Sequence, residues 1–134
     1  MIVAMGMSVA DLMTPDPLTL GGESTLSAAY VLMKQHGFRH VPIVEGGVLV
    51  GIVSLTDIGR LGATVGSILV KRIDEVMTKT PVTVGPTESI AVAAAKMATR
   101  KINCLPVVEN GKLVGIVTTY DLLDAFAQRL RDET

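Results

Sequence analysis

The chain repeats itself after 64 residues, and this repeat limits the possible folds more than any other feature of the sequence. Residues 11–58 align with residues 75–122 without a gap, and 17 of the 48 aligned pairs are identical. Chance would give only a few identities. A unit of about 50 residues buries too little surface to be more than marginally stable alone. We therefore predict two copies that share one core.

Both copies predict the same order of elements. Apolar residues recur at the helical spacing i, i+3, i+4 and i+7 from Leu26 and from Ile90, which indicates one amphipathic helix in each copy. Two apolar segments joined by a glycine-containing turn follow each helix and predict a hairpin. The other predicted segments are helical turns at 8–13 and 73–77, extended segments at 18–20 and 82–84, and final helices from Ser54 and from Thr118 to about Arg131.

These patterns predict an α/β (α+β) fold class, with two β-α-β-β-α repeats packed about a pseudo-two-fold axis. We place the first repeat at residues 8–62, a bridge at 63–72 and the second repeat at 73–132. The hairpin strands are expected at 40–44 and 48–53, and at 104–108 and 112–117. The expected helix caps are Ser24 or Thr25 and Thr87 at the helix starts, and Gly37 at the end of the first helix.

Composition and charge exclude several classes of protein. Hydrophobic residues make up 49% of the chain, which excludes intrinsic disorder. The longest stretch without Asp, Glu, Lys or Arg is the eleven residues 46–56, against about 20 in a membrane-spanning helix. The chain has twelve basic and thirteen acidic residues, and the basic residues are not clustered in a run. We therefore expect no nucleic-acid binding. The single Cys104 cannot form an internal disulfide, so we expect a cytoplasmic protein.

The most informative motif ends each hairpin and combines a glycine, a hydroxyl and a carboxylate. It reads Gly-Ile-Val-Ser-Leu-Thr-Asp at 51–57 and Gly-Ile-Val-Thr-Thr-Tyr-Asp at 115–121. One interpretation is a capping box, in which the acid and the hydroxyl satisfy backbone N–H groups. The glycine within the strand is not explained by capping and marks a close approach of backbone or ligand. Since a carboxylate can accept both hydroxyls of a ribose, the duplicated motif favours nucleotide binding.

The first hairpin begins with a basic pair that the second hairpin lacks. Arg39 and His40 can both donate hydrogen bonds to a phosphate, although a solvent-exposed arginine and a structural histidine are an equal alternative. The second copy has Asn103 and Cys104 at these positions. We interpret Cys104 as a small buried hydrophobic residue. The first site is therefore expected to bind phosphate better than the second.

Taken in order and in duplicate, these motifs resemble the cystathionine-β-synthase (CBS) domain. The series is Met-Thr-x-x-Pro, an amphipathic helix, Arg-His-Val-Pro-Ile-Val and Gly-Ile-Val-Ser-x-x-Asp, and the likeness extends from about Ser8 to Phe126. The tandem order resembles a CBS pair, or Bateman module, of the stand-alone type. In that family the two repeats pack into a disc-shaped module with adenosine-nucleotide clefts between them.

The resemblance also implies roles for individual residues. It implies that Asp57 and Asp121 hold the ribose hydroxyls and that Ser54 and Thr118 contact ribose or phosphate. It also implies that Arg39 and His40 face phosphate and that the segments near Thr19 and Thr83 line the adenine end. The leading hypothesis is a non-catalytic sensor that binds AMP, ADP or ATP, requires no cofactor and signals to a partner protein.

Other functions remain open. One alternative is an interaction or dimerisation module with degenerate clefts, which the intact Asp57 and Asp121 disfavour, and another is a module that binds S-adenosylmethionine or a dinucleotide. An enzyme is disfavoured because H-E-x-x-H, G-x-S-x-G and P-loop motifs are missing. The apolar excess predicts a homodimer formed by the helices after Ser54 and Thr118. In the second of these helices, a wide apolar stripe comprises Leu122, Leu123, Phe126, Ala127 and Leu130.

Overall fold

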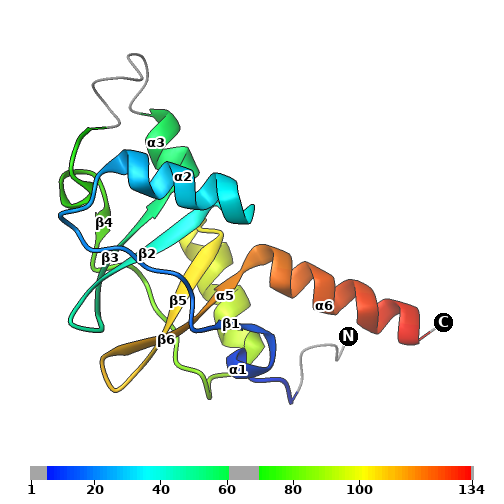
Figure 1. Cartoon of the computed structure of the whole chain (residues 1–134). Coiled ribbons are helices and arrows are strands. Elements are labelled where there is room, and N and C mark those ends of the chain that lie inside the picture. Colours follow the sequence, from blue (N-terminus) through cyan, green and yellow to red (C-terminus); the bar gives the residue numbers. More distant parts are fainter. Residues whose placement is uncertain (1–5, 61–69, 134) are drawn as a thin grey trace. The chain divides into compact units, whose positions relative to one another are not determined.

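The structure, a computed structural model, describes residues 6–60 and 70–133 of the chain. The chain divides into two compact units (Figure 1). The central unit comprises Leu18–Pro81, and the terminal unit joins Met1–Pro17 to Val82–Thr134. The chain therefore passes from one unit to the other twice, each time directly after a proline.

The central unit is built on the first hairpin and two helices. Its elements are α2 (Leu26–His36), β2 (His40–Glu45), β3 (Val48–Ser54), α3 (Leu55–Arg60), the 3-10 helix η1 (Ile73–Glu75) and β4 (Thr78–Lys79). Strand β3 lies between β2 and β4 and is antiparallel to both. Helix α2 contacts β2 and α3.

The terminal unit repeats this arrangement with a longer final helix. Its elements are α1 (Val9–Leu12), β1 (Thr14–Pro15), α5 (Ile90–Arg100), β5 (Cys104–Glu109), β6 (Lys112–Thr118) and α6 (Thr119–Asp132). Strand β6 lies between β5 and β1 and is antiparallel to both. Both units mix helices with antiparallel strands, so the predicted α/β (α+β) class is confirmed.

Each unit combines the hairpin of one sequence repeat with the leading segment of the other. Strand β4 opens the second repeat but pairs with β3 of the first, with Gly51 opposite Lys79. Strand β1 opens the first repeat but pairs with β6 of the second, with Gly115 opposite Pro15. The two repeats thus exchange their first segments, which ties them into one fold.

The glycine within each middle strand makes room for the methionine of the exchanged segment. A Cβ atom on Gly51 would overlap the Met77 sulfur and would lie 2.9 Å from Met77 Cγ and 3.0 Å from the Thr78 carbonyl oxygen. Gly115 has the same surroundings, provided by the methionine and threonine that open the first repeat. The sequence left two explanations for this glycine, close approach of the protein backbone or close approach of a ligand. The contact with the exchanged segment of the protein is sufficient to explain it.

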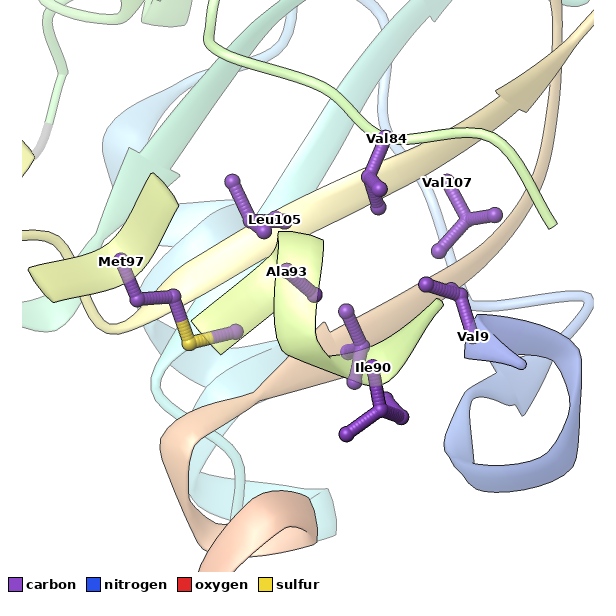
Figure 2. Close-up of a cluster of buried hydrophobic side chains, with 8 residues drawn as sticks. Val9, Val84, Ile90, Ala93, Met97, Leu105 and Val107 are labelled. Atoms are coloured by element: carbon purple, nitrogen blue, oxygen red, sulfur yellow. The ribbon is translucent and has the colours of Figure 1, made fainter. Parts of the chain in front are cut away.

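Each unit has its own hydrophobic core beneath its amphipathic helix. In the terminal unit, Ile90, Ala93 and Met97 of α5 pack with Leu105 and Val107 of β5, as Figure 2 shows. The equivalent residues of α2 pack on β2 and β3 in the central unit. The buried residues of the two cores are Val9, Val84, Ile90, Ala93, Met97, Leu105, Val107 and Val117, and Leu26, Ala29, Met33, Val41, Ile43, Val53 and Ile73.

The ends of the two amphipathic helices follow capping rules, with one difference from the expectation. Thr25 caps α2 by accepting a hydrogen bond from the Ala28 N–H (3.2 Å), and Gly37 ends it in the left-handed conformation. The predicted cap Thr87 of α5 is wrong, because Ser89 accepts the corresponding hydrogen bond (3.3 Å). Serine and threonine both serve as helix caps, and Ser89 directly precedes Ile90, the first buried side chain of α5.

Some of the expectations lie beyond what the structure describes. Residues 63–69 of the expected bridge lie outside the described residues. The pseudo-two-fold axis and the repeat boundaries stay predictions. None of the helices in the described ranges is long and apolar enough to cross a membrane.

Candidate functional site

In the central unit, four of the predicted site residues meet at the open end of the hairpin. His40 begins β2 and lies opposite Ser54, which ends β3. The Leu55 N–H donates to the carbonyl of Arg39 (2.8 Å), so the residue before β2 is held against the first residue of α3. Asp57 lies in the first turn of α3. Strand pairing and one helix start therefore bring these four residues together.

Ser54 and Asp57 form a reciprocal capping box. The Ser54 N–H donates to Asp57 Oδ2 (3.0 Å), and the Asp57 N–H donates to Ser54 Oγ (3.0 Å). The structural interpretation of the motif is thus correct for its geometry. The box uses one carboxylate oxygen, and Asp57 Oδ1 accepts no hydrogen bond from any side chain or backbone in the described ranges. The half-buried carboxylate can therefore accept further donors.

Thr19 lies in the segment that borders the same hairpin on its β2 side. The Leu20 N–H donates to the Pro42 carbonyl (3.2 Å), and the Val44 N–H donates to the Leu20 carbonyl (3.0 Å). This parallel bridge keeps Thr19 beside the first half of β2, which starts with His40. All five predicted residues of the first site are therefore in one unit.

Electrostatics differ between the two basic residues of this site. Burial lowers the pKa of His40 below its ordinary value; nearby Asp57 acts in the opposite direction, and Arg39 lowers it further. The free imidazole is therefore neutral at pH 7, while the exposed Arg39 guanidinium is always charged. Arg39 supplies a permanent positive charge at this end of the hairpin. His40 supplies an N–H donor, and a nearby anion favours its protonated, charged form.

The terminal unit has the same backbone arrangement with different side chains. Cys104 lies opposite Thr118, and the Thr119 N–H donates to the Asn103 carbonyl (2.9 Å). Thr118 and Asp121 form a capping box, in which the Thr118 N–H (2.8 Å) and hydroxyl (3.2 Å) both donate to Asp121 Oδ2. The second site thus keeps the hydroxyl and the carboxylate and lacks the basic pair.

Cys104 fits its interpretation as a buried hydrophobic residue. The side chain is buried, and burial, with a smaller contribution from Asp121, raises the pKa of its thiol to about 12. A thiol with such a pKa stays protonated at pH 7 and is a poor nucleophile.

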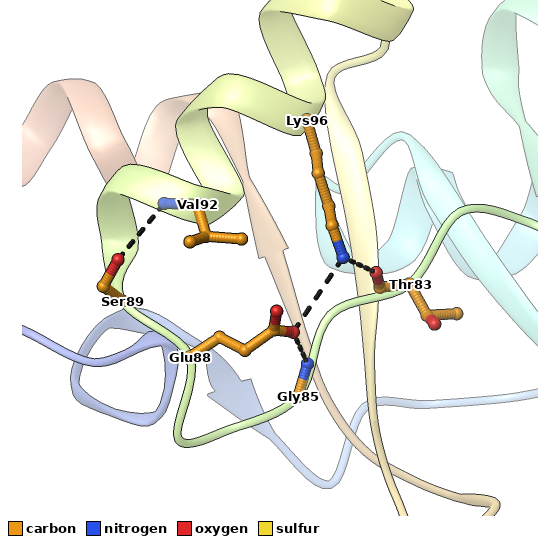
Figure 3. A network of polar contacts seen from close by, with 6 residues as sticks. All are labelled: Thr83, Gly85, Glu88, Ser89, Val92 and Lys96. Carbon is orange, nitrogen blue, oxygen red and sulfur yellow. Dashed lines mark hydrogen bonds and ion pairs between the residues drawn. The ribbon is translucent and has the colours of Figure 1, made fainter.

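Sequence reasoning missed Lys96, which lies beside the predicted residue Thr83. Its Nζ donates to the Thr83 carbonyl (2.8 Å) and lies 3.9 Å from Glu88 Oε2, and Glu88 in turn accepts a hydrogen bond from the Gly85 N–H (Figure 3). The aligned position in the first repeat is Leu32. A charge that occurs in only one copy was the signal that could have identified it.

Asp121 also lines a groove in the terminal unit between α1 and the polar face of α6. The groove has a volume of about 290 Å³. Four carboxylates and one guanidinium contribute to its wall, so its charge is negative. They do not converge on one point, since the described residues contain no group of three or more His, Cys, Asp or Glu that could hold a metal ion. The lining residues are Met7, Asp11, Leu12, Asp121, Asp124, Ala125, Gln128, Arg129 and Asp132.

Comparison with known sequences identifies one family and several relatives. The family model described as the CBS domain matches residues 9–62 and again residues 73–128. An inosine-5'-monophosphate dehydrogenase from Korarchaeum cryptofilum is 43% identical over 108 residues, which cover 80% of this chain and 22% of that enzyme. The CBS domain-containing protein YhcV from Bacillus subtilis is 37% identical over 115 residues, which cover 86% of this chain and 82% of YhcV.

Solved structures give the same result for the fold. A putative acetoin utilization protein (AcuB) from Vibrio cholerae has a TM-score of 0.83 and 35% identity, covering 96% of this chain and 97% of that one. The CBS domain pair of protein MJ0100, in complex with 5'-methylthioadenosine and S-adenosyl-L-methionine, has a TM-score of 0.83 and 30% identity, covering 92% and 98%. CBSX2 in complex with AMP has a TM-score of 0.78 and 27% identity, also covering 92% and 98%.

Proposed function

The chain belongs to the CBS-domain family as a tandem pair, and on this premise we propose that it is a regulatory module that binds an adenine nucleotide. AMP, ADP or ATP binds through the residues grouped at the hairpin ends. The binding event is passed to a regulated protein, and the chain itself carries out no reaction on the nucleotide. It acts in the cytoplasm as a homodimer.

The observation that carries this proposal is the state of the Asp57 carboxylate. Its Oδ2 accepts the Ser54 N–H, which fixes the orientation of the carboxylate. Its Oδ1 accepts no hydrogen bond from the residues that the structure describes. A ribose presents two adjacent hydroxyl donors, and a pre-oriented carboxylate accepts both at low cost in entropy.

The neighbouring basic pair supports a phosphorylated ligand at the same place. Arg39 is joined to the start of α3 through its carbonyl, and His40 lies opposite Ser54. A diol acceptor and two phosphate donors therefore occur at one hairpin end. Two related CBS pairs carry adenosine compounds in their solved structures, AMP in CBSX2 and S-adenosyl-L-methionine with 5'-methylthioadenosine in MJ0100, which supports the adenosine part of the proposal.

The terminal unit favours a second candidate ligand. Its hairpin end keeps Asp121 and Thr118 but has Asn103 and Cys104 in place of the basic pair. Four of the nine residues that line the groove beside Asp121 are carboxylates, against one arginine, and this negative charge disfavours a polyphosphate and favours a cation. Among the ligands left open, S-adenosylmethionine combines an adenosine with a positively charged sulfonium. We propose it as the alternative ligand of the terminal unit.

Isothermal titration calorimetry with adenosine, AMP, ATP and S-adenosylmethionine tests both proposals. The wild-type chain is expected to bind AMP more tightly than adenosine. Arg39→Ala should weaken AMP binding by about tenfold, the scale of one charge-assisted hydrogen bond, and leave adenosine unchanged. Arg100→Ala, which removes an exposed arginine of α5, is the control. Equal losses for AMP and adenosine would contradict the role of Arg39, and failure of all four compounds to bind would contradict the proposed function.

A further inference from the structure

In the terminal unit, the segment 83–88 lies beside strand β5. The Val84 N–H donates to the Pro106 carbonyl (3.1 Å), and a parallel bridge joins the two chain segments at this point. Strand β5 starts at the hairpin end that contains Thr118 and Asp121. The segment 83–88 therefore borders the candidate site of the terminal unit.

Lys96 of α5 holds the same segment from the helix side, as Figure 3 shows. Its Nζ donates to the Thr83 carbonyl (2.8 Å) at the start of the segment, and it lies 3.9 Å from Glu88 Oε2 at the end of the segment. The same Oε2 accepts a hydrogen bond from the Gly85 N–H. The Lys96–Glu88 pair thus ties both ends of the segment to each other and to α5.

The central unit has the equivalent segment without this pair. There the Leu20 N–H donates to the Pro42 carbonyl (3.2 Å), which repeats the bridge to the strand. At the positions aligned with the two charged residues the first repeat has Leu32 and Ser24, whose side chains cannot form an ion pair. Since both units form the same bridge, the fold does not require the pair.

The pair restrains the segment more than it stabilises the whole chain. The side chains of Lys96 and Glu88 are 35% and 39% exposed, and ion pairs so open to water contribute little to the free energy of unfolding. Their contacts nevertheless fix the carbonyl of Thr83 and the N–H of Gly85. A segment that is already fixed loses less conformational entropy when a ligand contacts it.

We propose that Lys96 is a positioning residue of the terminal unit and that it holds the segment 83–88 in the conformation that receives an adenosine compound. This inference rests on the proposed function, because it requires that the terminal unit binds such a compound. Glu88 balances the positive charge of Lys96, so the pair orders the segment without attracting a phosphate. The two units then reach their affinity by different means, charged contacts with Arg39 in the central unit and pre-organisation in the terminal unit.

Calorimetry with S-adenosylmethionine and AMP on the Asp57→Ala chain tests this role, because that substitution weakens the site of the central unit. In this background Lys96→Leu, which introduces the residue of the first repeat, should raise the dissociation constant of the bound compound about tenfold. Lys96→Arg should bind like its parent, since a guanidinium can also donate to the Thr83 carbonyl. Lys34→Leu removes the lysine of α2 that lies over the Tyr30 ring, and it is the matched control.

A second background separates positioning from a general effect on the fold. Lys96→Leu should have little further effect on binding in Asp121→Ala, because the binding that remains there belongs to the central unit. Hydrogen exchange of residues 83–88 should become faster in Lys96→Leu, while urea unfolding stays close to that of the wild type. A merely structural role would lower the affinity equally in the two backgrounds.

Three results would count against these proposals in different ways. Equal affinity of Lys96→Leu and its parent, or an equal loss in both backgrounds, would overturn the positioning role and leave the proposed function standing. If AMP bound to the wild type and neither compound bound to Asp57→Ala, the positioning role and the ligand of the terminal unit would be wrong, but not nucleotide binding by the central unit. Failure of both compounds to bind the wild-type chain would overturn the proposed function itself.

Discussion

The two hairpin ends of this molecule share a backbone and differ in chemistry. In both, a strand ends in a hydroxyl residue, and an aspartate three residues later closes a capping box, Ser54 with Asp57 and Thr118 with Asp121. In both, the first helical N–H after the strand donates to the residue before the opposite strand. Only the central unit adds Arg39 and a histidine there.

This comparison distinguishes the residues that form the shared scaffold from the residues that select a ligand. Both units contain the strand glycine packed on a methionine, the capping box and the bridge to the neighbouring segment, so these features belong to the shared scaffold. The basic pair occurs once, so folding does not require it. Residues that vary between two copies of one scaffold are therefore better candidates for ligand selectivity than residues that both copies keep.

The largest expected effect comes from removing the carboxylate of the central unit. Asp57→Ala should weaken adenosine and AMP alike by about 10- to 100-fold, because hydrogen bonds to a charged acceptor contribute about 1.5–3 kcal/mol. Asp121→Ala should weaken AMP binding less, since its hairpin end has Asn103 and Cys104 in place of the basic pair. Calorimetry with both ligands measures the losses.

A third capping box provides the control for this comparison. The Ser8 N–H donates to Asp11 Oδ2 (2.8 Å) at the start of α1, which belongs to the terminal unit and not to the unit that contains Asp57. Asp11→Ala should cost about 1 kcal/mol of stability, as loss of a cap does, without weakening the binding of AMP to the central unit. If Asp11→Ala and Asp57→Ala reduced affinity equally, the aspartates would act only as helix caps.

An effect of comparable size, on stability, is expected at Gly51 and Gly115, the strand glycines that make room for a methionine side chain. Gly51→Ala and Gly115→Ala should each destabilise the fold by about 1–3 kcal/mol through overpacking, because each Cβ would meet a methionine side chain and a threonine carbonyl. Gly46→Ala, in the open turn of the first hairpin, has space for a Cβ but a φ of +57°, and it should cost less. Urea unfolding measures all three. If the losses of stability for Gly51→Ala and Gly115→Ala differed markedly, the two units would not share this close packing of glycine on methionine.

The sequence predicted most of the scaffold and the local grouping of the first site. Periodicity, turn residues and the 64-residue repeat were sufficient for the helices and hairpins, because these depend on neighbours in sequence. The exchange of β1 and β4 between repeats could not be predicted, since two repeats with the same pattern of residues offer equivalent pairing partners within one copy and between copies. Lys96 was missed for a related reason, because its contact with Thr83 spans 13 residues and leaves no local pattern.

A smaller effect, on pH dependence, distinguishes His40 from Cys104. The pKa of His40 is lowered in the folded chain. As the pH decreases through the ordinary histidine pKa of 6.5, the unfolded chain therefore binds more protons than the folded chain, and stability falls. A bound phosphate favours the imidazolium, so AMP should restore stability most at the lower pH. His40→Gln should remove both trends, as measured by thermal unfolding from pH 7.5 to 5.

The control is His36→Gln, which changes the exposed histidine of α2 and should preserve both trends. The phosphate of AMP titrates in the same range, but it does so equally in all variants, so the difference between variants isolates His40. Cys104, at the aligned position of the terminal unit, contributes no such trend, because the pKa of its thiol is raised to about 12. If His40→Gln had the pH profile of the wild type, the imidazole would not face the phosphate.

The smallest expected effect concerns the ends of the two amphipathic helices. Gly37 and Lys101 occupy aligned positions, and both adopt the left-handed conformation, with φ of 73° and 55°. This conformation strains every residue with a Cβ by about 1–2 kcal/mol, while glycine loses about 0.5–1 kcal/mol more on folding. Lys101→Gly should therefore stabilise the fold by somewhat under 1 kcal/mol, and Gly37→Lys should destabilise it by a similar amount. Chemical denaturation measures both changes in the free energy of unfolding. If Lys101→Gly lost stability, the lysine side chain would make a contact that stabilises the fold by more than the backbone strain costs.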